Sequence, residues 1–384
     1  MRNKIAPVVD EAIETLNMKD GPARRRLIAG AGLFSATAAA SALIAACTSS
    51  QGGAASAARA VAGDFPATPR WKFTFVNHVT DNPFFTPTRY GFADCARLLG
   101  LPDPAWTGAS SAQSTVPTML STLNAAVAAN SPGIATSVVD ATAFVSSIDS
   151  ALARGIPIVT YNANGSAADP TSGLAYVGQD LYASGLAVGT RLASLIHKGD
   201  TVAGVIAQPG SLNIQPRLDG AVAALRAAGM TIMFGSKGLD AGNSVAQETS
   251  AVAEFIRSHG SEIQGIFAVD GGDTALIGAS LAKYGLSGKV AAGGFDLEPQ
   301  TLAAIKAGHL DFTVDQSPYL QGFLPTLYLY LWQLSGGLIA PSSADTGQKL
   351  VTRSNVAPYT SRATRFEGST AAYRYIQHSG AISI

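Results

Sequence analysis

The sequence predicts an α/β protein made of two doubly wound parallel-sheet lobes. From about Trp71 onward, apolar runs of strand length alternate with amphipathic stretches of helix length, which is typical of parallel sheets with helices on both faces. The chain has 384 residues, more than one average domain uses, and it shows no repeat of solenoid length. Together these observations favour two sheets over a single lobe.

The predicted strands are short apolar runs, and most are separated by a predicted helix. They cover residues 72–77, 134–138, 157–161, 175–178, 202–207, 265–270, 290–295, 312–314 and 350–352. Capping residues mark helix ends: Thr86 precedes Pro87 and a helix that stops at Gly100, and Asp140 precedes a helix that runs to Arg154. Gln, Gly and Pro interrupt the apolar stretch 319–334, so we expect a buried helix there rather than a membrane span.

The first 46 residues predict an export signal. Arg24, Arg25 and Arg26 precede an uncharged stretch rich in Ala, Gly and Ser that ends at Cys47. The arginines and the apolar pair after them resemble a twin-arginine signal, and the small residues before Cys47 resemble a bacterial lipobox. We therefore expect residues 1–46 to be removed and the mature chain to begin at an acylated Cys47. The alternative is an uncleaved membrane anchor, since the stretch is long enough to cross a bilayer.

The mature chain predicted in this way has a flexible tether and a nearly neutral body. Residues 47–70 contain mostly Gly, Ala, Ser and Pro, which is typical of a linker. Removing residues 1–46 takes away six of the 26 basic and four of the 26 acidic side chains, which leaves 20 against 22. That balance argues against nucleic acid as a partner and gives no membrane-binding face beyond the lipid. Cys95 is the one cysteine of the body, so we expect no internal disulfide.

Polar and aromatic side chains gather in the loops that follow the predicted strands. In open parallel sheets, ligands bind at the carboxyl ends of the strands, where such loops border a crevice. Amides, carboxylates and guanidinium groups hydrogen-bond hydroxyls, and aromatic faces cover the C–H side of a ring, so the mixture suits a sugar. The loops are 77–85, 161–165, 208–217, 270–273, 295–298 and 315–319.

Five motifs in order resemble the ribose-binding-like family of periplasmic binding proteins, and within it the simple-sugar ABC importer components. They are Thr80-Asp81-Asn82-Pro83-Phe84-Phe85, the segment 155–162, Arg217-Leu218-Asp219-Gly220, Gly293-Gly294-Phe295-Asp296 and the segment 314–322. The resemblance implies a type I fold with a three-crossing hinge near Gln179, Gln316 and Val351. The implied lobes are residues 71–178 plus 317–350 and residues 179–316 plus 351–384.

The resemblance also implies a set of ligand-binding residues: Asn82, Phe84, Phe85, Arg217, Asn243, Asp270, Asp296 and Gln316. The phenylalanines would cover the sugar ring from the first lobe, and Gln316 would reach the ligand from a hinge crossing. Asn162 stands where ribose binders carry an aspartate, and Ala163 stands where they carry an arginine. Ribose itself is therefore in doubt, and Asn164 or His78 could compensate for the lost hydrogen bonds.

Several of these residues have a second interpretation that needs no ligand. Aspartates before helices often serve as N-caps, and asparagines often serve as turn residues. The alternatives are caps for Asp270 and Asp296, core packing for Phe84 or Phe85, a surface salt bridge for Arg217, and turns for Asn162 and Asn164.

We expect an exported solute-binding lipoprotein that captures a monosaccharide or small polyol and delivers it to an ABC importer permease, without metal or cofactor. The five histidines show no metal-ligand spacing, and no Gly-x-Ser-x-Gly elbow or phosphate-binding loop is present. Converging acids such as Asp270 and Asp315 leave a glycoside-acting enzyme as a less favoured alternative. A sensory binding protein that serves a chemoreceptor or kinase is another alternative. A sugar-responsive regulator is excluded, because an export signal occupies the place of its helix-turn-helix.

Overall fold

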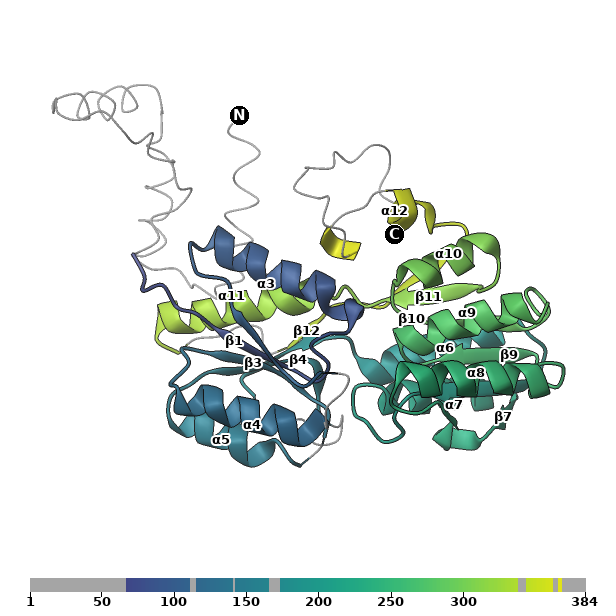
Figure 1. Ribbon diagram of the computed structural model, residues 1–384, viewed down its shortest axis with the longest axis horizontal. Helices are drawn as coiled ribbons and strands as arrows, with labels where there is room; N and C mark the ends of the chain where they lie inside the picture. The colour runs from purple at the N-terminus through teal and green to yellow at the C-terminus, as the bar shows by residue number, and fades with distance from the viewer. Residues whose placement is uncertain are drawn as a thin grey trace, which may run out of the picture. The chain divides into compact units, whose positions relative to one another are not determined.

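The computed structural model describes residues 67–110, 115–140, 142–165, 173–337, 343–361 and 365–367. All of them belong to one compact unit, Ala67–Ile384. The predicted signal, Cys47 and nearly all of the tether lie outside the described residues. Figure 1 shows two α/β lobes, each built on its own sheet. The predicted fold class, two parallel-sheet lobes, is confirmed.

The first sheet has six strands, and every neighbouring pair in it is parallel. Helices α3 (Thr86–Leu98) and α11 (Leu320–Ser335) cover one face, and α4 (Thr115–Ala128) and α5 (Val145–Ala153) cover the other (Figure 1). Its strands, in spatial order, are β12 (Ser343–Asp345), β5 (Ala175–Gly178), β4 (Ile158–Asn164), β3 (Ile134–Val138), β1 (Thr74–Asn77) and β2 (Ala105–Gly108).

The second sheet is parallel except at one edge, where β13 pairs antiparallel with β11. Helices α6 (Leu181–Ala193) and α7 (Gln215–Ala227) cover one face, and α8 (Val245–His259), α9 (Gly271–Lys283) and α10 (Pro299–Ala307) cover the other. The strands are β13 (Lys349–Thr352), β11 (Phe312–Asp315), β10 (Ala291–Phe295), β9 (Gly265–Ala268), β6 (Thr201–Ile206) and β7 (Thr231–Met233), with β8 (Leu239–Asp240) also paired to β6.

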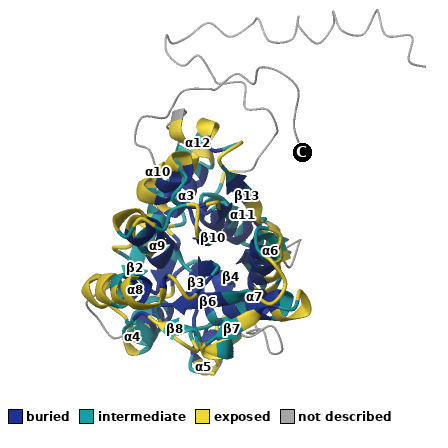
Figure 2. Cartoon of the chain, turned by 90° about the vertical axis from the view of Figure 1, so that its right-hand side faces the viewer, coloured by how far each residue is buried: buried dark blue, intermediate teal, exposed yellow. Residues whose placement is uncertain are grey.

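The strands form the cores because their side chains are apolar on both faces. Figure 2, in which the two lobes overlap, shows buried strands in the middle and exposed outer helix faces around them. Helices α3 and α11 approach closely because Gly91 and Gly322 lack side chains at the contact. A Cβ added to Gly91 would lie 2.0 Å from the carbonyl oxygen of Tyr319. The predicted buried helix at 319–334 is therefore the second layer of the first lobe.

Within the described residues, the chain passes between the sheets three times: after β5, after β11 and between β12 and β13. The last passage comes a few residues before Val351. Lys349 and Leu350 pair with Asp315 and Val314 in the second sheet, although the sequence placed them with the first lobe. An edge strand of four residues offered no alternation pattern that could have located its start.

The nine predicted strands are present with ends shifted by at most three residues, and four further strands were not predicted. The unpredicted strands β2, β7, β8 and β12 are short and partly exposed, so they lack an apolar run. Helix α5 begins at Val145, later than predicted, because Asp140 accepts hydrogen bonds from the backbone N–H groups of Thr142 and Ala143 in a separate turn. Among the described helices, none is long and apolar enough to span a membrane.

The C-terminal segment touches elements of both lobes. Helix α12 (Ala357–Ser361) packs against α10, and the 3-10 helix η5 (Arg365–Glu367) packs against α3. The Arg365 guanidinium donates to both carboxylate oxygens of Asp94, at 2.7 and 2.8 Å, and lies 4.1 Å from the ring centre of Tyr90. This contact joins the end of the described chain to the first lobe.

Candidate functional site

The first lobe contributes a short aromatic segment to the space between the lobes. The 3-10 helix η3 (Pro83–Phe85) follows β1, and the Asn82 side chain caps it by accepting a hydrogen bond from the N–H of Phe84 at 2.9 Å. Phe85 is buried against His78 and Trp106, so its role includes core packing. Phe84 is half-buried and lines a cavity, which leaves part of its ring open to a ligand.

The second lobe contributes a buried guanidinium group. Arg217 on α7 is 3% exposed and donates to the carbonyl oxygen of Val269 and to Oε1 of Gln179, both at 3.1 Å. Its guanidinium lies 4.3 Å from the ring centre of Phe295. Its Nε has no hydrogen-bond partner among the described residues. Two hydrogen bonds therefore hold the Arg217 guanidinium in place, and its Nε–H can still donate to a ligand. Because the side chain is buried, Arg217 does not form a surface salt bridge.

Two predicted aspartates lie near this guanidinium, and only one of them caps a helix. Asp270 is the N-cap of α9, where its Oδ1 accepts from the N–H of Asp273 at 2.9 Å, and its buried Oδ2 has no partner among the described residues. Asp296 is 6% exposed and does not cap α10, whose N-cap position is occupied by Glu298. The capping interpretation thus fits Asp270, with one oxygen left over, but does not fit Asp296.

A chain of hydrogen bonds joins the two lobes through the hinge. Gln316 donates to Oδ1 of Asp296 at 2.6 Å, and Gln321 donates to Oε1 of Gln316 at 3.0 Å. The Asn162 amide then donates to Oε1 of Gln321 at 3.1 Å. All four side chains are buried. Asn162 and Asp296 both have positive φ, 64° and 74°, a strained region for non-glycine residues that often marks functional positions.

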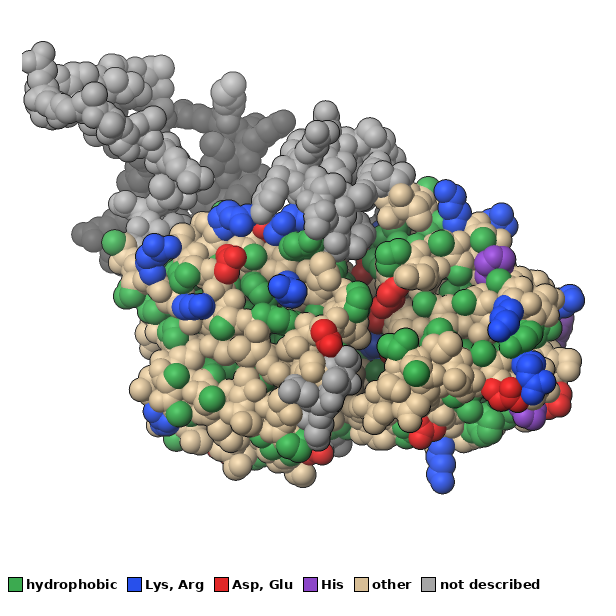
Figure 3. Space-filling view, viewed as in Figure 1, with side chains coloured by type: hydrophobic (Ala, Val, Ile, Leu, Met, Phe, Trp, Pro, Cys, Tyr) green, Lys and Arg blue, Asp and Glu red, His purple; other side chains and the backbone are tan. Residues whose placement is uncertain are grey.

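The acidic side chains around Arg217 are strongly perturbed. Burial raises the pKa of Asp296 to about 6, although Arg217 and the bond from Gln316 oppose the rise. Burial and the neighbouring Asp270 raise the pKa of Asp273 to about 10. Burial and Asp296 raise the pKa of Glu298 well above its ordinary value. The Asp273 carboxyl group is thus neutral at pH 7 and can donate as well as accept hydrogen bonds. Figure 3 shows acidic side chains along the furrow between the lobes.

Two predicted residues do not join this cluster. Asn243 is exposed just before α8, where its backbone N–H donates to Oε1 of Gln247 at 3.2 Å. Asn164 is half-buried at the end of β4 and accepts a 2.6 Å hydrogen bond from the Thr160 hydroxyl. Local hydrogen bonds involve both residues, and for Asn164 this fits the alternative interpretation as a turn residue.

Other residues of the cluster were not in the set of ligand-binding residues that the resemblance implied, although His78 was named as able to compensate for lost hydrogen bonds. His78 follows β1, and its ring bonds Ser137 at 3.2 Å and, across the lobes, Asn213 at 3.3 Å. Burial and the Arg217 charge lower the pKa of His78 to about 4, so the ring is neutral at pH 7. Gln179 and Glu298 follow β5 and β10, and this position after a strand is the sequence feature that could have marked them as candidate site residues. Gln321 is the second residue of α11 and belongs to the family-like segment 314–322, but the resemblance implied no ligand contact for it.

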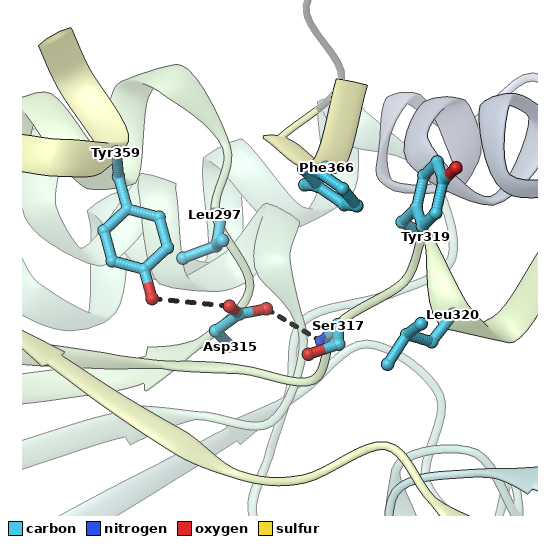
Figure 4. Close-up of a pocket in the computed structure, with 7 residues that line it drawn as sticks. All are labelled: Leu297, Asp315, Ser317, Tyr319, Leu320, Tyr359 and Phe366. Atoms are coloured by element: carbon cyan, nitrogen blue, oxygen red, sulfur yellow. Dashed lines mark hydrogen bonds between the residues drawn. The ribbon is translucent and has the colours of Figure 1, made fainter. Parts of the chain in front are cut away.

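Two cavities border the cluster on its hinge side. One, of about 60 Å³, lies between Phe84 of the first lobe and Leu297 and Glu298 of the second. The other, of about 240 Å³, is shown in Figure 4, where Tyr359 and Asp315 face Tyr319 and Phe366 across it. The described residues hold no group of three or more His, Cys, Asp and Glu side chains placed to bind a metal ion.

The chain is similar to known proteins in sequence and in structure. The model of the periplasmic binding protein domain matches residues 73–331. A xylose/arabinose-binding protein, XylF, from Sulfolobus acidocaldarius is 42% identical over 327 residues, which are 81% of this chain and 78% of that protein.

Solved structures with the same fold include two sugar-binding proteins. The glucose-galactose binding protein GanP from Geobacillus stearothermophilus is 23% identical with a TM-score of 0.65, covering 75% of this chain and 99% of that one. A solute-binding protein from Burkholderia graminis in complex with D-arabinose is 23% identical with a TM-score of 0.67, covering 77% and 99%.

Proposed function

Because the chain belongs to the periplasmic binding protein family, we propose that it captures a monosaccharide or similar polyol outside the cytoplasm and delivers it to an ABC importer permease. Members of this family bind ligands for transport, and the protein is a binding protein rather than an enzyme. The relative that is 42% identical is named for xylose and arabinose. Pentoses are therefore the first ligands to test.

The observation that carries the proposal is the unused hydrogen-bonding capacity between the lobes. Arg217 Nε, Asp270 Oδ2 and Glu298 Oε2 are buried without partners among the described residues. Leaving such a group unpaired costs about 1 to 3 kcal/mol, so a cluster of three points to a ligand that satisfies them. Sugar hydroxyls both donate and accept, and the half-buried ring of Phe84 offers a flat face to the sugar ring.

The proposed mechanism is closure of the two lobes on the ligand. We assign residues 71–178 plus 317–348 to the first lobe and residues 179–316 plus 349–361 to the second. The pairing of β13 with β11 supports placing Lys349 and Leu350 in the second lobe. A ligand that contacts both lobes favours the closed state by its differential affinity for that state, and the importer recognises it. The bonds from Gln316 to Asp296 and from Gln321 to Gln316 would align the hinge with both halves of the site.

The same proposal includes export and a lipid anchor at Cys47, which lies outside the described residues. The support is the sequence pattern of three arginines, an apolar stretch and a cysteine after small residues. Mass spectrometry of the mature protein should find an acylated N-terminal Cys47, and Cys47→Ala should remain uncleaved or soluble. An unmodified cysteine at the start of a soluble mature chain would contradict the anchor.

The experiment that tests sugar binding is a thermal-shift screen of the full chain in detergent against xylose, arabinose, glucose, galactose and polyols. A ligand that binds only the native state adds about 2.7 kcal/mol of stability at a hundredfold excess over its dissociation constant. Small-angle scattering of the Cys47→Ala chain should show a smaller radius with the same ligand. Tight binding without compaction would contradict lobe closure, and no binding to any sugar would contradict the function.

A further inference from the structure

Glu298 is a half-buried acid whose Oε2 atom is fully buried and unpaired among the described residues. It follows β10 and occupies the N-cap position of α10, yet its side chain makes no capping hydrogen bond. Its Oε2 is buried without a hydrogen-bond partner among the described residues. A side chain of this kind is normally exposed unless it is paired. We therefore expect its Oε2 to pair with a group that is not part of the chain.

A glycine on the neighbouring helix makes room for this carboxyl group. Gly271 is the first residue of α9, next to Asp270, and a Cβ added there would lie 2.0 Å from Oε1 of Glu298. The next residue, Gly272, has no such neighbour, because the nearest atoms to its added Cβ are at 3.5 and 3.6 Å. The close approach of Glu298 to α9 thus depends on one glycine of the pair and not on the other.

The same carboxyl group lines a small cavity that is otherwise apolar. The cavity of about 60 Å³ is bordered by four prolines, Leu297, Phe366, Phe84 and Glu298. A cavity needs only about 10 to 15 Å³ of this volume to hold one water molecule, so a hydroxyl or hydroxymethyl group fits. Phe84 comes from the first lobe and Glu298 from the second, which places the cavity at the boundary that closes on a ligand.

We propose that Glu298 is a specificity-determining residue that hydrogen-bonds a hydroxyl-bearing substituent of the bound sugar in this cavity, beside the ring of Phe84. The inference rests on the proposed sugar-binding function and adds a contact that no motif of the sequence assigned. A single polar group in an apolar pocket fixes the orientation of a ligand, because only one of its substituents can satisfy that group.

The charges around Glu298 are consistent with this role. Asp296 from β10 and Asp270 from α9 face it, and with burial they raise its pKa. Arg217 from α7 acts on both of those aspartates. A carboxylate accepts hydrogen bonds and a protonated carboxyl group both donates and accepts them, so Glu298 can bond a sugar hydroxyl in either state.

The test combines Glu298→Ala with sugars that lack single hydroxyl groups. Calorimetry measures affinities of the full chain and its variant for D-xylose, its three monodeoxy analogues at positions 2, 3 and 4, and D-glucose, which adds a hydroxymethyl group. Loss of one buried hydrogen bond to a carboxyl group should lower affinity about tenfold or more. For the sugar that lacks the bonded substituent, the parent and Glu298→Ala should bind equally, which a merely structural role of Glu298 would not produce.

A pair of glycine variants tests the same contact without touching Glu298. Gly271→Ala should displace the carboxyl group and reproduce the selectivity change of Glu298→Ala, while Gly272→Ala should bind like the parent. Both substitutions add the same methyl group to the same helical turn, so they are matched in helix propensity.

Different results would contradict sugar binding by the protein and the role of Glu298. A parent protein that binds no sugar of the series overturns the proposed function and this inference with it. A parent that binds, with Glu298→Ala weakened by the same factor for every sugar or not weakened at all, overturns the role of Glu298 alone.

Discussion

Asp296→Asn should make the ligand-free protein more stable at neutral pH and less able to bind its ligand. Burial of the Asp296 carboxylate raises its pKa, so its charge destabilises the folded state. Asparagine has the same shape, keeps an oxygen that can accept the hydrogen bond from Gln316, and tolerates the φ of 74° at this position. The substitution therefore removes the charge with little other change.

The size and the pH window of the effect follow from the pKa. A carboxyl group whose pKa rises from 3.8 to about 6 on folding binds a proton more tightly in the folded state. The stability it contributes is complete below about pH 4 and is lost as the pH rises to about 6. Two pKa units correspond to about 3 kcal/mol. The variant should thus match the parent near pH 4 and exceed it by up to about 3 kcal/mol at pH 7.5, or roughly 4 to 5 °C in Tm.

The assay is urea unfolding of ligand-free parent and variant between pH 4 and pH 8, with calorimetry of sugar binding at pH 7.5. Asp103→Asn, which changes an exposed carboxylate, is the control and should follow the parent at every pH. Affinity should fall tenfold to a hundredfold in Asp296→Asn, because a charge-assisted hydrogen bond to a hydroxyl is lost. A stability difference that is the same at pH 4 and pH 7.5 would refute the burial argument.

Three further substitutions test other parts of the structure. Phe84→Ala should weaken sugar binding with little change in preference between epimers, which calorimetry with xylose and arabinose measures; a reversed preference would contradict a face-covering role. Arg217→Ala should lower affinity at least about tenfold and also lower Tm, since Val269 and Gln179 lose their donor; unchanged affinity in a folded variant would displace the proposed site. Arg365→Ala should lower the free energy of unfolding by about 1 to 2 kcal/mol, because its pair with Asp94 is largely buried, whereas Arg97→Ala on the same carboxylate should cost less than about 1 kcal/mol. Equal effects would mean that the Arg365 contact does not hold the C-terminal segment.

Much of the site could be predicted because its residues follow strands. Asp270 and Asp296 follow the ends of parallel strands, Arg217 lies in the segment after another strand, and the structure brings all three together. Phe84 follows the first strand and reaches the same boundary. Position after a strand is local information, and a parallel sheet places all such ends at one edge.

Residues that act through a partner distant in sequence could not be predicted. Gln321 is the second residue of a helix, and it joins the cluster through bonds with Gln316 and with Asn162, which lies 159 positions earlier. Asn243, which the resemblance implied as a ligand-binding residue, is exposed, and its backbone N–H bonds locally to Gln247. The sequence identifies Glu298 only as a residue that precedes a helix. Its contact with Gly271 is visible only in the tertiary structure.

The sequence by itself determined the two parallel sheets, the order of their main strands and the residue types at the strand ends. Hydrophobic periodicity and turn residues are properties of short segments, so they can be identified from the sequence alone. Only the tertiary structure decided which of those polar groups stay unpaired once buried, and which pKa values shift as a result. Desolvation and the loss of hydrogen-bond partners depend on everything within a few ångströms, and those neighbours come from segments far apart in the chain.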